Sequence, residues 1–111
     1  AFIGIGMSAD KPQLRSVMDT AIALRKLALL PVLDVYGSDD LDLVLDSVGA
    51  RFDAIRSAGS PRSQQIMLTG SDHFHDGSEA KLTAVVVDWL GVAVGRCWAD
   101  NNMLAVKQRS Y

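Results

Sequence analysis

The chain has 111 residues, of which 49% are hydrophobic and 22% charged, and its formal net charge is −2. These are the values of an ordinary globular domain, and they exclude a disordered or fibrous protein. The length allows one domain, which we place at residues 1–98, with a C-terminal tail over residues 99–111. The chain lacks the basic excess of a nucleic-acid-binding protein, and its longest uncharged apolar run, Trp89–Gly95, is too short to span a membrane.

Three short apolar runs predict strands, and each is followed by a stretch of helical periodicity. The first strand is Phe2–Gly6, which is apolar throughout, as expected for a strand covered on both faces. A helix is predicted from about Asp10 until Pro31, with apolar residues recurring at steps of three and four. The second strand, Val32–Tyr36, ends at Gly37.

A second helix is predicted after Asp39 or Asp40, since either aspartate can cap its N-terminus. Its buried face is expected to comprise Leu41, Val44, Leu45, Val48, Phe52 and Ile55. A third strand, Ile66–Thr69, leads through a turn-rich loop at 70–77 into the last helix. The last helix is expected to bury Leu82, Val85, Val86, Trp89 and Ala93.

The alternation of strands and helices predicts an α/β fold in three layers. The order β-α-β-α-β-α implies a parallel three-stranded sheet with helices on both faces. Ligands of such sheets bind beyond the carboxyl ends of the strands. A sheet of three strands is narrow, so we expect a protein partner or a further part of the same protein to cover its edge.

The end of the first strand fits the pattern G-x-G-x-x-A over residues 4–9, which predicts a dinucleotide-binding turn. Against this interpretation, the helix begins later, and Asp10 at its entrance would repel a phosphate group. Small residues where a strand ends are the alternative explanation. The same stretch is a poor nucleophile elbow, because Asp10 stands where G-x-S-x-G requires its last glycine.

The cysteine and the histidines bear on metals and redox chemistry. Cys97 is the single cysteine, which excludes an internal disulfide and a cysteine-built metal site, and it fits a small apolar filler or a reactive thiol. A single cysteine does not indicate the cellular compartment of the protein. His73 and His75 could bind a metal with a flanking aspartate, but alternation along an extended chain would point their rings apart. Loop histidines without a role are the plain alternative.

An acidic residue after the second strand and a histidine after the third occur in the order of a hydrolase triad. Asp39 and Asp40 follow the second strand, and His73 follows the third. A carboxylate beyond a parallel strand can orient a catalytic histidine, and histidine is the common general base near neutral pH. The plain alternative is that both aspartates are N-terminal helix residues.

With its surroundings, this pattern resembles the C-terminal half of the α/β-hydrolase fold. The stretch at 31–40, PVLDVYGSDD, is similar to the penultimate strand and acid turn of that fold. The stretch at 70–77, GSDHFHDG, is similar to its histidine loop, and Asp88-Trp89-Leu90 to its closing helix. The closest resemblance is to a bacterial α/β-hydrolase-like family of unknown function, with its PvLDvYG and GaDHfFdG motifs. It extends from about Phe2 to Leu90.

The resemblance implies roles for particular residues. His73 would be the triad histidine and Asp40 its acid, with Asp39 as the second choice, whereas His75 would have no catalytic role. The nucleophile elbow and oxyanion-hole loop would lie upstream of Ala1. The serines tested for the elbow do not supply its motif: Ser8, Ser38, Ser60, Ser63, Ser71 and Ser78.

Three functions follow as expectations. The chain would be the C-terminal part of a serine-hydrolase-like protein, an esterase or related acyl hydrolase, that is inactive without its nucleophile and needs no cofactor. The alternative is a non-catalytic binding or assembly subunit of a larger complex, in which a partner or an N-terminal half of the protein covers the sheet edge. A dinucleotide-binding module is the third.

Overall fold

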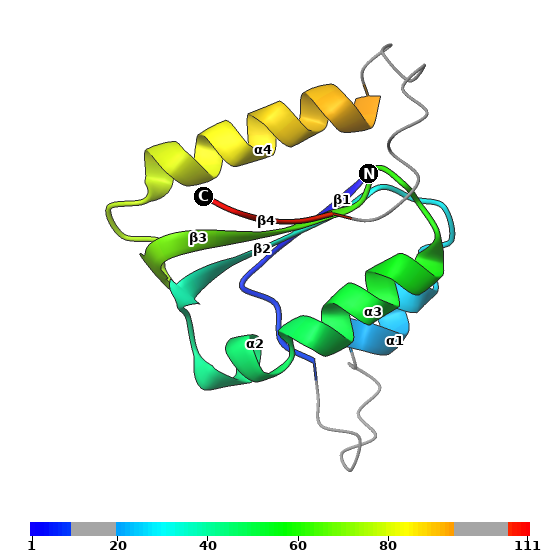
Figure 1. Ribbon diagram of the computed structural model, residues 1–111, viewed down its shortest axis with the longest axis horizontal. Helices are drawn as coiled ribbons and strands as arrows, with labels where there is room; N and C mark the ends of the chain where they lie inside the picture. The colour runs from blue at the N-terminus through cyan, green and yellow to red at the C-terminus, as the bar shows by residue number, and fades with distance from the viewer. Residues whose placement is uncertain (10–19, 95–106) are drawn as a thin grey trace.

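The computed structural model describes residues 1–9, 20–94 and 107–111. The strands are β1 (Phe2–Ile5), β2 (Val32–Asp39), β3 (Gln64–Asp72) and β4 (Lys107–Ser110). The helices are α1 (Thr20–Arg25), α2 (Asp42–Asp46), α3 (Val48–Ala58) and α4 (Glu79–Val94). Figure 1 shows α4 over one face of the sheet and α1, α2 and α3 over the other. The predicted start of the first helix, near Asp10, lies outside the described residues.

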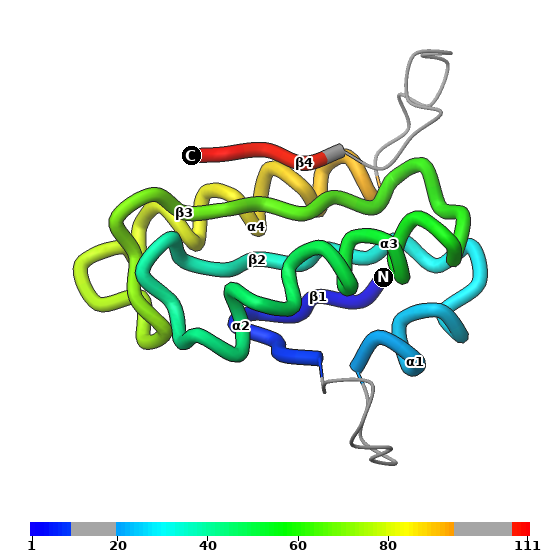
Figure 2. Tube along the Cα trace, turned by 60° about the horizontal axis from the view of Figure 1, so that its bottom comes forward, coloured from blue at the N-terminus to red at the C-terminus, as the bar shows by residue number. Residues whose placement is uncertain are grey.

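The sheet is parallel, in the order β1-β2-β3-β4, so the predicted α/β class with a parallel sheet is confirmed. The predicted number of three strands is wrong. Residues of the expected tail form β4, which pairs with β3 from Gln64↔Lys107 to Met67↔Ser110. Figure 2 shows β1 and β4 at opposite edges of the sheet. The fourth strand was missed because it is short and polar and lacks an apolar face.

Two apolar clusters hold the layers together, one on each face of the sheet. Successive side chains of a strand point to opposite faces of the sheet. Val32 of β2 therefore belongs to one cluster, and Leu33 and Val35 belong to the other. On the α4 face the cluster comprises Leu33, Val35, Ile66, Leu68, Val85, Trp89 and Ala93. On the other face it comprises Ala9, Ala21, Leu24, Val32, Ala54 and Ile55. The predicted buried stripe of the last helix is confirmed, with Leu82 and Val86 partly buried beside its three fully buried residues.

The segment predicted as one helix after the second strand is two helices. They meet at Ser47, whose hydroxyl donates to the carbonyl oxygen of Leu43 and accepts a hydrogen bond from the backbone N–H of Ala9. Such local bonds between a serine and the backbone compete with a continuous helix. Leu41, expected to be buried, precedes α2 and is 53% exposed.

A charged pair is buried between β2 and α3. The side chains of Asp34 and Arg51 are both 0% exposed, and Nε of Arg51 lies 2.9 Å from Oδ2 of Asp34. The same Oδ2 accepts a hydrogen bond from Nε2 of Gln65 on β3. The pair therefore joins the helix layer to two adjacent strands. No helix in the described part of the chain is long and apolar enough to cross a membrane.

Candidate functional site

The turn after β2 holds one carboxylate in a fixed position. Asp40 directly follows β2, and its backbone N–H donates to the carbonyl oxygen of Gly37 at 3.3 Å. The side chain turns inward: Oδ2 accepts the N–H of Gly37 at 3.2 Å, and Oδ1 accepts the N–H of Leu41 at 2.8 Å. The Asp40 side chain is 0% exposed. Two backbone N–H groups thus orient this carboxylate independently of its contact with any other side chain.

The loop after β3 brings His73 onto this carboxylate. Nδ1 of His73 lies 2.7 Å from Oδ1 of Asp40, and 33% of the histidine side chain is exposed. An ionised carboxylate can only accept hydrogen bonds, so Nδ1 carries the hydrogen and Nε2 is left as a basic nitrogen. Among the described residues, no hydrogen bond involves Nε2 of His73. This is the geometry of a general base held by an acid.

The structure brings together His73 and Asp40, and it does not bring Asp39 to the histidine. Asp39 is the exposed last residue of β2, and it lies opposite Asp72 in the register of the sheet. The pairing register of β2 with β3 shifts between Gly37 and Asp39. The acid of the pair is therefore the residue just beyond the strand.

The pKa of Asp40 is lowered from its usual value. Burial by itself raises this pKa, but the hydrogen bonds from the N–H of Gly37, from His73 and from the N–H of Leu41 outweigh it. Asp40 therefore remains ionised in the folded protein at pH values where a free aspartate begins to take up a proton.

This shift predicts an acid-dependent loss of stability. The contribution of Asp40 should be complete above the pKa of an unfolded aspartate, about 4, and should be lost as the pH falls through the lower folded value. Urea unfolding at a series of pH values should show a shallower decline in Asp40→Asn than in the wild type. Asp39→Asn, which alters an exposed neighbour, should keep the wild-type decline, and equal slopes in all three proteins would contradict the prediction.

Gly6 follows β1 and lies directly against the His73 ring. Its φ is +61°, and a Cβ placed on it would come within 3.1 Å of both Nδ1 and Cε1 of His73. This position is part of the G-x-G-x-x-A pattern, and in the structure the glycine makes room for an imidazole. Asp10, which follows the pattern, lies outside the described residues. The contact of Gly6 with the histidine was not predicted, although the position of this glycine directly after a strand was a signal.

The two histidines of the loop have different partners. Nδ1 of His75 lies 2.7 Å from Oγ of Ser71, and both side chains are buried. Phe74, between the histidines, is 77% exposed and packs edge-on against His73 with ring centroids 5.5 Å apart. In the described part of the chain, no group of three or more metal-ligating side chains gathers at these histidines or elsewhere.

No serine of the described ranges is hydrogen-bonded to His73. The hydroxyl of Ser38 accepts the N–H of Gly70, that of Ser63 accepts the N–H of Val32, and that of Ser71 is bound to His75. Cys97, considered as a filler or a thiol, lies outside the described residues. Among the described residues, the site therefore consists of the His73 imidazole and the Asp40 carboxylate.

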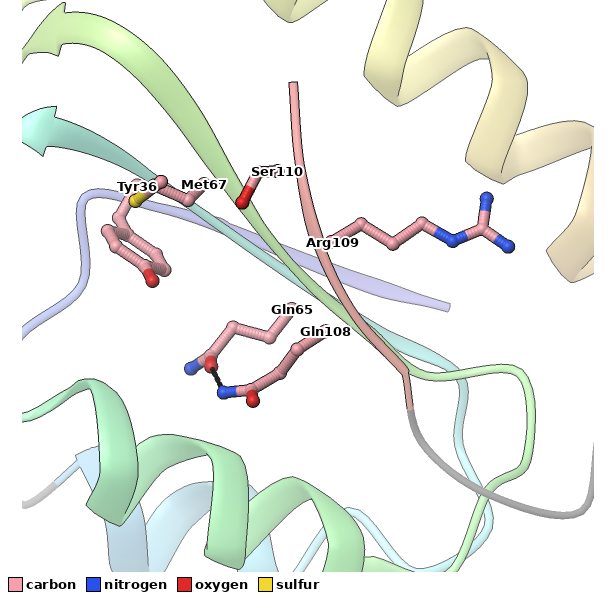
Figure 3. Close-up of a pocket in the computed structure, with 6 residues that line it drawn as sticks. All are labelled: Tyr36, Gln65, Met67, Gln108, Arg109 and Ser110. Atoms are coloured by element: carbon pink, nitrogen blue, oxygen red, sulfur yellow. Dashed lines mark hydrogen bonds between the residues drawn. The ribbon is translucent and has the colours of Figure 1, made fainter.

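A pocket of about 200 Å³ lies apart from this pair, on the sheet at β3 and β4. Its lining comprises Tyr36, Gln65, Met67, Gln108, Arg109 and Ser110. In Figure 3, Nε2 of Gln108 bonds Oε1 of Gln65, and Arg109 points away toward α4. The lining includes neither His73 nor Asp40, so this pocket is separate from the His73–Asp40 pair.

Comparisons of the chain with models of known protein families, with curated proteins and with solved structures find no match.

Proposed function

We propose that this chain supplies the acid and the base of a serine-hydrolase-like site that acts on an ester or a related acyl substrate. The observation that carries the proposal is the contact of 2.7 Å between Nδ1 of His73 and Oδ1 of the buried Asp40. The order of the two residues, each after a parallel strand, agrees with the resemblance to the C-terminal half of the α/β-hydrolase fold.

The chemistry follows from the two nitrogens of His73. Asp40 accepts the hydrogen of Nδ1, which keeps Nε2 free to take a proton from a hydroxyl nucleophile. The negative charge of Asp40 then stabilises the imidazolium that forms. In the second half of the reaction, the same nitrogen returns the proton to the leaving group.

The nucleophile of the proposed site comes from outside these residues. None of the described serines is hydrogen-bonded to His73, and the sequence has no G-x-S-x-G. Loss of the nucleophile costs on the order of 10⁶ in kcat, so the 111-residue chain alone should be inactive. The nucleophile would come from a further part of the same protein or from a second chain.

A fluorophosphonate probe tests the proposal on the protein expressed from its complete reading frame. The probe should label a serine of that protein, and His73→Ala should abolish the labelling. Asp40→Asn should slow it by roughly 10³–10⁴-fold, because the tautomer of His73 is no longer set.

Two controls sharpen the result. Asp39→Asn changes the neighbouring exposed carboxylate and should label at the wild-type rate. The 111-residue chain alone should not be labelled. The hydrolase function would be refuted if the protein from the complete reading frame were not labelled. It would also be refuted if the wild type and His73→Ala were labelled equally.

A second candidate is a non-catalytic assembly subunit, and the edge of β1 favours it. Within the described residues β1 pairs with β2 alone, so its other edge presents unpaired backbone groups. Phe2 and Ile5 on this strand are 39% and 46% exposed. Analytical ultracentrifugation of the 111-residue chain at micromolar concentration should then show an oligomer that Ile5→Lys weakens. A folded monomer would count against this candidate.

The dinucleotide-binding module has less support. The His73 ring lies against Gly6, where a pyrophosphate would have to approach the backbone. We do not propose this function.

A further inference from the structure

The loop that carries His73 contains a second buried pair of polar side chains that the proposed chemistry does not use. Ser71 is 0% exposed and His75 is 5% exposed, and their Oγ and Nδ1 atoms are 2.7 Å apart. His73 lies between them in the sequence. The Ser71–His75 bond therefore closes the loop on both sides of the histidine that contacts Asp40.

Backbone contacts show that His75 turns the loop inward. Its φ is +57°, a left-handed conformation that non-glycine residues seldom adopt. Its N–H donates to the carbonyl oxygen of Asp72, and its own carbonyl oxygen accepts the N–H of Ser78 at the entrance to α4. The exposed Phe74 lies immediately before this inward turn. The side chain of His75 is thus buried at a position where the backbone conformation is itself energetically unfavourable.

The hydrogen-bond pattern of the pair indicates which atom donates. Oγ of Ser71 lies 3.4 Å from the carbonyl oxygen of Asp72, to which its hydroxyl hydrogen can be directed. Nδ1–H of His75 then donates to Oγ. Nε2 of His75 is buried without a partner in the described structure, and a bare acceptor there is less costly than an unpaired N–H. Both members of the pair are held in one orientation.

Ser71 also contacts the turn that holds the acid. A Cβ placed on Gly37 would overlap the carbonyl oxygen of Ser71, so the backbones of the two turns are in close contact there. Gly37 in turn donates its N–H to Oδ2 of Asp40. Contacts therefore run from His75 through Ser71 and Gly37 to Asp40, the partner of His73.

We propose that His75 is a positioning residue that, through its hydrogen bond to Ser71, holds His73 against Asp40. Its importance for activity rests on the proposed hydrolase function, but its effect on the histidine–acid contact does not. An aromatic ring without Nδ1 at this position would keep the packing and lose the hydrogen bond. The role is therefore separable from the filling of space.

Proton NMR of the 111-residue chain tests the proposal without a nucleophile. The Nδ1–H of His73 should give a strongly downfield resonance, assigned by its loss in Asp40→Asn. This resonance should be lost or broadened by exchange with water in His75→Phe and in Ser71→Ala. In His75→Asn, whose amide can replace Nδ1–H as the donor to Ser71, the resonance should be retained. Asp76→Ala, which changes an exposed residue of the same loop, is the control and should retain it.

Near-UV circular dichroism and tryptophan fluorescence report whether each variant is folded. If His75→Phe does not fold, Ser71→Ala, which removes one hydroxyl, decides. A folded His75→Phe or Ser71→Ala with an unchanged downfield resonance would overturn the positioning role. So would a wild-type chain without that resonance, because the contact to be positioned would be absent. A present resonance in a protein that the fluorophosphonate does not label would refute the hydrolase function and leave the positioning of His73 standing.

Discussion

Replacement of Arg51 by methionine is expected to lower the free energy of unfolding by about 3–5 kcal/mol. Arg51 is fully buried, and it donates to Oδ2 of Asp34, to the carbonyl oxygen of Val44 at 2.7 Å and to Oγ of Ser47 at 2.6 Å. Methionine fills part of the space but leaves the carboxylate of Asp34 without its cation. Urea unfolding followed by circular dichroism measures the loss.

Arg56 provides a matched control on the same helix. It pairs with Asp53 at 3.2 Å, but both side chains are more than half exposed, so Arg56→Met should cost less than about 1 kcal/mol. Equal effects of the two substitutions would contradict the importance of the buried pair. The double variant Asp34→Leu with Arg51→Met should recover part of the loss, since it removes both charges.

The pH dependence of Arg51→Met gives a second check. Burial raises the pKa of Asp34, and the Arg51 guanidinium opposes that rise. Without the guanidinium, the folded state binds a proton at Asp34 more readily than the unfolded state does. The stability of the variant should therefore rise relative to the wild type as the pH is lowered from neutrality toward the unfolded value of about 4.

Gly37→Ala is expected to destabilise the protein by about 3 kcal/mol and to separate His73 from Asp40. The new Cβ would overlap the carbonyl carbon and oxygen of Ser71, which are backbone atoms and cannot rotate away. The end of β3 would have to move, and it leads directly into the histidine loop. Urea unfolding measures the first effect, and the downfield resonance of His73 measures the second.

Gly91→Ala is the control for this substitution. Gly91 is an exposed residue within α4, and a Cβ there would meet no atom within 4 Å. Alanine is favoured over glycine inside a helix, so this variant should gain about 0.5–1 kcal/mol and retain the resonance. A Gly37→Ala protein as stable as the wild type would show that the two turns can separate at little cost.

The parts of the fold that could be predicted are those whose burial follows a regular apolar pattern. β1, β2 and β3 each contain an apolar run, although β2 and β3 extend beyond it into polar residues, and α4 has an apolar stripe at helical spacing. The polar edge strand β4 and the break at Ser47 were missed, because each depends on partners distant in the sequence. The buried Arg51 was missed because periodicity assigns arginine to the surface. Asp34, in the middle of a buried strand, was the signal that a cation lies opposite.

The residues of the candidate site could be predicted, but the contacts that hold them in place could not. His73 and Asp40 are polar residues after adjacent parallel strands, and such strand ends meet at one edge of a sheet. The choice of Asp40 over Asp39 depends on one residue of register at the end of β2; periodicity leaves it open, and the resemblance favoured Asp40. The contact with Gly6 and the burial of His75 depend on the path of a loop, and no local pattern encodes that path.

The register of the sheet has a consequence for how the chain folds. Phe2 pairs with Val32, Leu33 with Gln64, and Gln64 with Lys107, so every strand contact joins distant parts of the sequence. Among the described strands no hairpin is available to start the sheet, and each of these pairings must first close a long loop. Sheets of this kind form more slowly than helical bundles of equal size, and their uncovered strands are exposed to aggregation during that time. Production of the chain at low temperature and low concentration should therefore favour recovery of folded protein.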